Sequence, residues 1–163
     1  MGNRAVITTA DNLEQEGVEL QNRTDKVGIY LHWNGGFDSV QAFLTYAKMQ
    51  GVRSPIDDNY GWARLCQIIS NYFTEKAHDL LSIGIDTLNN LDCDNIDNGV
   101  YCIDENWDIV NRFYNAGPEQ TFHDLAEMLR DIDIHQPEKM QLGNQAILDW
   151  LANNEPTKLK KGV

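Results

Sequence analysis

The sequence predicts an α+β fold in one domain, with helices packed on a mainly antiparallel sheet in the order ββ-αα-βββ-αα. Three observations indicate this class. Short β-rich runs are separated by turn residues, four other segments repeat apolar residues at helical spacing, and 163 residues, 42% of them hydrophobic, suffice for one core. We assign residues 1–155 to the domain and expect residues 156–163 to form a basic, flexible tail.

Two strands and two helices are expected in the first half of the chain. Residues 4–9 and 27–33 predict strands because β-branched and aromatic residues are frequent in them. Asn34-Gly35-Gly36 ends the second strand, and Asp38 or Ser39 can cap a helix that ends at Gly51. The next helix has the clearest pattern, with one apolar face formed by Trp62, Leu65, Cys66, Ile69, Tyr72 and Phe73.

Three strands and two further helices are expected in the second half. Residues 81–85, 100–103 and 107–113 predict strands, the last two joined as a hairpin, and an Asn/Asp-rich loop follows the first. A helix starts at Pro118, and Pro137 separates it from the last helix. Groups of strands followed by pairs of helices are typical of α+β domains.

The composition excludes several classes of protein. A net charge of −12 repels nucleic acid and anionic membranes, so we expect neither as a direct partner. The chain has no apolar run long enough for a membrane span and no signal-peptide pattern, which predicts a cytoplasmic protein. Cys66, Cys93 and Cys102 lack the spacing of zinc ligands or of a disulfide framework, and we expect no cofactor and no metal.

A short segment near the N-terminus carries a resemblance. Ile29, Tyr30, His32, Trp33, Asn34 and Gly35 form an Ile-Tyr-x-His-Trp-Asn-Gly run that follows an Arg-containing strand and leads into a helix. This arrangement resembles small uncharacterised proteins encoded by bacteriophages and mobile elements. The resemblance covers roughly the first 50 residues. It implies a phage or mobile-element setting and brings no catalytic residue with it.

The same corner offers one candidate site. His32 and Asp38 flank the glycine turn, and a histidine beside a carboxylate can act as a general base. Glycine backbone N–H groups can also approach an anion at a helix start. In the structural alternative, which we favour, Trp33 packs, His32 bonds a turn carbonyl and Asp38 only caps the helix. The ligand-binding candidates are Tyr30, Trp33, Gly35, Gly36 and Arg64.

Arg64 is a ligand-binding candidate for a reason separate from the glycine corner. It follows Tyr60 and Trp62 near the start of a predicted helix. A guanidinium beside aromatic rings can hold an anionic or planar ligand. The alternative is an ordinary ion pair with Asp57 or Asp58.

The middle of the chain concentrates negative charge. No Lys or Arg occurs between Lys76 and Arg112. Carboxylates gathered on one rigid face can meet a basic cleft of another protein by electrostatic complementarity. Solubility alone is the alternative, and a calcium loop is disfavoured because Ile96 and Asp97 depart from the EF-hand order. The protein-binding candidates are Asp86, Asp92, Asp94, Asp97, Asp104, Glu105 and Asp108.

These observations favour binding over catalysis. The leading hypothesis is a phage- or mobile-element-encoded accessory or counter-defence protein that binds a basic host protein through its negative surface. The alternative is a small enzyme or ligand-binding protein that uses the corner between His32 and Asp38. A third possibility, an assembly component, predicts a large exposed apolar patch.

Overall fold

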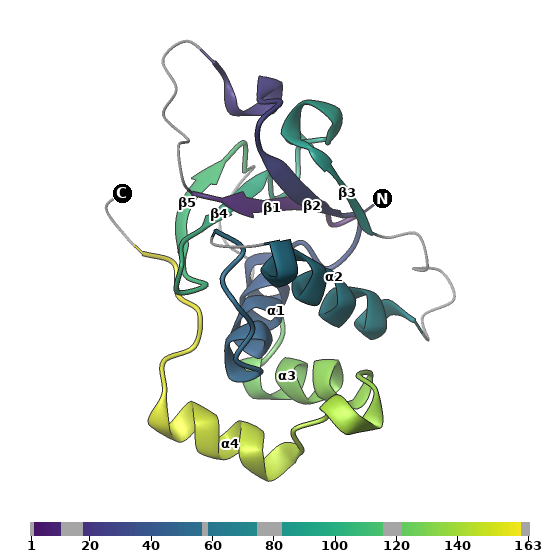
Figure 1. Ribbon diagram of the computed structural model, residues 1–163, viewed down its shortest axis with the longest axis vertical. Helices are drawn as coiled ribbons and strands as arrows, with labels where there is room; N and C mark the ends of the chain where they lie inside the picture. Colours follow the sequence, from purple (N-terminus) through teal and green to yellow (C-terminus); the bar gives the residue numbers. More distant parts are fainter. Residues whose placement is uncertain (1, 11–17, 57–58, 75–82, 116–121, 161–163) are drawn as a thin grey trace.

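A five-stranded sheet with helices on one face forms the framework of the protein (Figure 1). This computed structural model describes residues 2–10, 18–56, 59–74, 83–115 and 122–160. The strands are β1 (Ala5–Thr9), β2 (Val27–Leu31), β3 (Ile83–Thr87), β4 (Val100–Ile103) and β5 (Ile109–Phe113). The helices are α1 (Phe37–Met49), α2 (Asn59–Phe73), α3 (Leu125–Ile134) and α4 (Asn144–Asn153), and the 3-10 turns are η1 (Leu20–Asn22), η2 (Leu88–Asn90) and η3 (Glu138–Met140).

The α+β class and the element order are confirmed. Across the sheet the strands lie in the order β3-β2-β1-β4-β5. Three of the four neighbouring pairs are antiparallel, as expected for a mainly antiparallel sheet, and only the pair of β1 with β4 is parallel. This parallel pair places the start of β4 beside the start of β1, so the loop that precedes β4 lies near the N-terminus.

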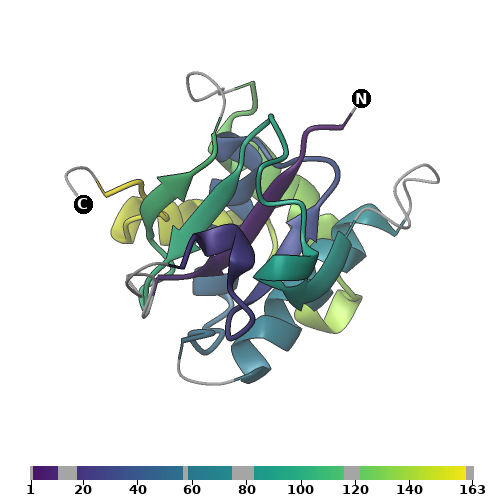
Figure 2. The same cartoon turned by 90° about the horizontal axis from the view of Figure 1, so that it is seen from above.

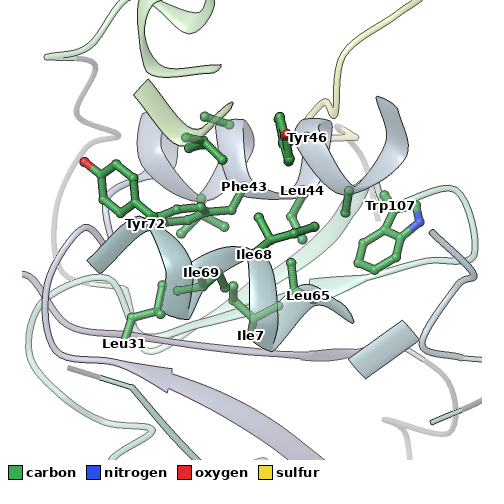
Figure 3. Close-up of a cluster of buried hydrophobic side chains, with 14 of the residues drawn as sticks. Ile7, Leu31, Phe43, Leu44, Tyr46, Leu65, Ile68, Ile69, Tyr72 and Trp107 are labelled. Carbon is green, nitrogen blue, oxygen red and sulfur yellow. The ribbon is translucent and has the colours of Figure 1, made fainter. Parts of the chain in front are cut away.

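The helix side of the sheet holds the main hydrophobic core. Side chains alternate along a strand, so Ala5 and Ile7 of β1 point toward the helices together with Leu31 of β2. Figure 3 shows these strands facing Phe43 of α1 and Leu65 of α2, with other apolar side chains between them. The apolar face predicted for the second helix from Trp62 to Phe73 therefore lies in this core on α2.

The opposite side of the sheet is covered by loops. Figure 2 looks onto this side, where η1 and η2 lie across the strands. A smaller apolar cluster fills the space beneath them, formed by Val6, Leu20, Leu88, Cys93, Val100 and Cys102. All residues of β1 and of β4 are buried for this reason.

The segment after α4 is bound to the fold up to residue 160, whereas a flexible tail is expected there from the sequence. The backbone of Ile109 in β5 bonds Lys158 and Lys160 at 2.9 and 2.8 Å. Thr157 is fully buried, its N–H donating to the Thr45 hydroxyl at 3.0 Å and its own hydroxyl to the Trp107 carbonyl at 2.8 Å. Residues 161–163 lie outside the described part of the chain.

Candidate functional site

The structure gives His32 local partners. Its Nδ1 lies 2.9 Å from the Tyr30 hydroxyl, and its ring meets Trp33 edge-on with 5.2 Å between the ring centroids. The His32 carbonyl accepts the N–H of Asn3 at 2.9 Å. His32 is half-buried in this setting.

Asp38 has a structural role, because its carboxylate accepts three backbone N–H groups. Its Oδ2 accepts the backbone N–H groups of Phe122 and His123 at 2.7 and 2.8 Å, and its Oδ1 accepts that of Ser39 at 2.8 Å. Only 7% of the residue is exposed. Asp38 thus fastens the segment before α3 to the first turn of α1, and its oxygens are aimed at backbone donors and not at His32.

The backbone of Gly35 contacts the N-terminal segment, and Gly36 lies beside Asp38. The N–H of Gly35 donates to the Asn3 carbonyl at 2.8 Å, and its carbonyl accepts the Tyr101 hydroxyl at 2.8 Å. A Cβ at Gly35 would lie only 2.5 Å from the Asn3 oxygen, whereas at Gly36 the nearest atom to a Cβ would be the Asp38 Oδ1 at 3.2 Å. At Gly35 the Asn3 carbonyl therefore already bonds the backbone N–H that an anion would need.

Arg64 lies away from this corner. It lines a pocket of about 440 Å³ whose other walls are Gln50, Gly51, Val52, Arg53 and Tyr60. Of the ligand-binding candidates, only Arg64 contributes to this pocket. The alternative partners Asp57 and Asp58 lie outside the described residues.

Four of the seven candidate carboxylates precede β4 in the sequence and three follow it, with Asp86 lying in β3 at the edge of the sheet. Before β4, Arg4 binds two of them, with its Nε 2.8 Å from Asp97 and its Nη1 3.4 Å from Asp92. Burial opposes ionisation of Asp97, but the hydrogen bonds from Arg4 outweigh it and hold the pKa of Asp97 below its usual value. The Asn90 amide likewise lowers the pKa of Asp86 through a hydrogen bond.

The carboxylates after β4 serve mainly to build the hairpin. Asp104 and Asp108 are 8% and 5% exposed, and Lys160 forms ion pairs with both. Asp104 also accepts backbone N–H groups within the turn, while Asp108 accepts that of Lys158 at 3.0 Å. Glu105 is exposed at the same turn. Asp104 and Asp108 are therefore internal groups that balance lysines and are not a free negative surface.

A rigid turn in the loop before β4 was not predicted. Asn95 is 1% exposed, and its side chain bonds five backbone groups of residues 92–99. The next residue, Ile96, has a φ of 63° and is 75% exposed. This φ is strained for a β-branched residue, so the turn holds an apolar side chain outward at a conformational cost. A single isoleucine among Asp and Asn residues was the available signal in the sequence.

The cysteines are placed as inert packing groups. Burial raises the pKa of Cys66 and Cys93 to about 11 and that of Cys102 to about 12, and Asp92 adds to the effect at Cys93. Within the described ranges no three His, Cys, Asp or Glu side chains form a group that would hold a metal ion.

Comparisons with protein-family models, with curated proteins and with solved structures each give no match. No helix in the described part of the chain has the length and apolar character needed to cross a bilayer. Function is therefore inferred from the geometry of this chain.

Proposed function

We propose that this protein binds a basic partner protein through residues 86–97, which we call the acidic loop. The observation that carries the proposal is Ile96, an exposed apolar side chain held in a strained conformation between Asp94 and Asp97. Protein interfaces commonly place an apolar anchor at the centre and polar groups around it. The acidic loop has this arrangement.

Rigidity supports the proposal. The buried Asn95 side chain donates to the carbonyls of Asp92, Cys93 and Gly99 and accepts two backbone N–H groups. Leu88 and Cys93 anchor the same loop in the cluster on the sheet. A side chain presented by such a fixed turn loses little conformational freedom on binding, which favours affinity.

Charge supports a basic partner. Asp86 and Asp94 are exposed and form no ion pair with another described residue, and the Asp92 side chain is 51% exposed beside Arg4. The acidic loop therefore keeps negative charge that its own fold does not neutralise. Carboxylates in such a position speed association with a cationic surface and select against anionic partners. We therefore leave Asp104 and Asp108 out of the proposed binding surface, because lysines already pair with them.

The biological setting remains that of the leading hypothesis. The resemblance of the segment from Ile29 to Gly35 supports a phage- or mobile-element-encoded accessory or counter-defence protein acting on a host protein in the cytoplasm. The alternative enzyme at the corner of His32 and Asp38 is disfavoured, because both oxygens of Asp38 already accept backbone N–H groups.

Capture from a bacterial host lysate at low and high ionic strength tests the proposal. The bait is compared with Asp94→Lys and with Ile96→Asp, each of which changes an exposed side chain of the acidic loop. Glu155→Lys and Ile134→Asp are the matched controls, since both residues are exposed elsewhere. We expect a basic protein that is retained by the controls, lost with both loop variants and released by salt. Retention by the loop variants, or binding that salt does not weaken, would contradict the proposal.

A further inference from the structure

The pocket that contains Arg64 has one wall built at the end of α1. Gly51 has a φ of 67°, which ends the helix and turns the chain back. The Gln50 amide donates to the Tyr46 hydroxyl at 2.9 Å and to the Met140 carbonyl at 2.7 Å, while the Val52 carbonyl accepts the Trp107 indole N–H at 3.3 Å. These contacts from three parts of the chain hold the wall in place.

The first turns of α2 form the other wall. Tyr60 and Arg64 are four residues apart, so they lie on the same side of the helix. Gly61 lets this helix approach the chain before it, since a Cβ there would lie 2.3 Å from the Arg53 carbonyl oxygen. This close approach brings the Arg53 guanidinium carbon to 5.6 Å from the centroid of the Tyr60 ring.

The pocket differs in charge from the rest of the chain. Among its described lining residues the charged ones are Arg53 and Arg64, although the protein carries 25 acidic and only 13 basic side chains. Arg64 presents five N–H donors, one of which contacts Gln67 at 3.1 Å, and guanidinium donors match the oxygens of phosphate and carboxylate. Tyr60 is 66% exposed and offers a ring face. A volume of about 440 Å³ lies within the usual range of small-molecule sites.

We propose that this arginine pocket binds a small planar anion. Arg64 contacts the phosphate or carboxylate of the ligand, and Tyr60 stacks on its ring while Arg53 positions the Tyr60 side chain. The pocket is a second site, built from elements other than the acidic loop, and its occupation does not depend on the protein partner proposed above.

Isothermal titration calorimetry of the full chain tests the site with two probes, AMP for a phosphorylated ring and 4-hydroxybenzoate for a carboxylated ring. We expect at least one probe to bind with a Kd below about 1 mM. Arg64→Gln should weaken that binding by about tenfold or more, because it removes charge-assisted hydrogen bonds. Arg130→Gln on α3 is the matched control and should leave the Kd unchanged, since Arg130 lies outside the pocket.

Two further ligands separate the parts of the proposed contact. Adenosine, which has the ring without the charge, should bind at least tenfold more weakly than AMP. Inorganic phosphate lacks a ring to stack, so it should bind the parent protein more weakly than AMP does. For the same reason its Kd should be equal for the parent protein and for Tyr60→Leu. Failure of both AMP and 4-hydroxybenzoate to bind would overturn the proposal, as would equal binding by Arg64→Gln and Arg130→Gln. The capture experiment with the acidic loop is unaffected by either result.

Discussion

The two faces of the sheet are stabilised in different ways. On the helix face, the β-strands and helices α1 to α4 enclose a continuous apolar core that includes Leu31 and Phe43 (Figure 3). On the loop face, a smaller apolar cluster around Leu88 is bordered by side-chain hydrogen bonds from Asn95 and Arg4. One sheet thus supports a core on one side and a hydrogen-bonded loop surface on the other.

The difference shows where this fold can vary its surface. Close packing on the helix face leaves little freedom to change a side chain without a loss of stability. The loop face takes its shape from bonds to the backbone, most of all those of Asn95. Exposed positions beside such anchors, Asp94 and Ile96 among them, can therefore be changed without altering the turn. A binding surface is better placed on this face.

The largest expected effect compares the same substitution on the two faces. Leu31 and Leu88 are both fully buried, the first on the helix face and the second on the loop face. Leu31→Ala should reduce the free energy of unfolding by about 4 kcal/mol and Leu88→Ala by about 2.5 kcal/mol, because loops collapse into a cavity more easily than packed helices. Urea denaturation measures both. Equal losses would show that the two faces are equally rigid.

The next effect concerns the hydrogen bonds of the loop face. Asn95→Ala should cost about 3 kcal/mol, because it leaves buried backbone groups without their partners. Hydrogen exchange should accelerate at the N–H groups of Asp97 and Gly99, which Asn95 accepts. Asn89→Ala is the control, and this exposed residue should change stability by less than about 0.5 kcal/mol. A similar small change for Asn95→Ala would mean that the turn is not held by its side chain.

The fold was predictable from the sequence because its signals are local. The helix expected to end at Gly51 corresponds to α1, which ends at Met49, and the apolar face from Trp62 to Phe73 predicted α2. Pairing between distant segments left no such signal. The parallel pair of β1 with β4 and the burial of Thr157 both depend on contacts across much of the chain. These contacts could not be read from residue spacing.

The candidate site was harder to predict for the same reason. A run of carboxylates without nearby cations predicts one negative surface, yet Arg4 binds Asp97 from 93 residues away. Lys160 likewise forms an ion pair with Asp104, which lies far from it in the sequence. Asp38 lies close to His32 in the sequence, but its main partners are backbone groups about 85 residues further on. Charge patterns identify candidate groups, whereas the fold decides which charges remain free.

A smaller effect tests the strain at the acidic loop. Ile96→Gly should increase the free energy of unfolding by about 1 kcal/mol, because glycine adopts a positive φ without the steric cost of a branched side chain. The same change should weaken capture of the basic partner. Ile96→Val keeps the branch at Cβ and is the control, with stability nearly unchanged. Loss of stability in Ile96→Gly would show that the side chain supports the fold and is not held outward against its preference.

The smallest expected effect is the pH dependence of the bond between Arg4 and Asp97. Since folding lowers the pKa of Asp97 below the ordinary aspartate value of 3.8, the folded state binds its proton more weakly than the unfolded chain. The stabilisation is therefore complete above the pKa of the unfolded chain and is lost as the pH falls through the lowered pKa of the folded state.

Urea denaturation from pH 7 to pH 2.5 measures this loss. The parent protein should exceed Asp97→Asn in stability by at most about 1 kcal/mol at neutral pH, because the pair is partly exposed. The difference should stay constant down to about pH 5 and shrink below the ordinary aspartate pKa of 3.8. Asp94→Asn, which removes one charge without touching Arg4, controls for net charge. A difference that instead grows toward low pH would mean that Arg4 does not favour the ionised form of Asp97, and the loop face would then owe its order to Asn95 and the apolar cluster.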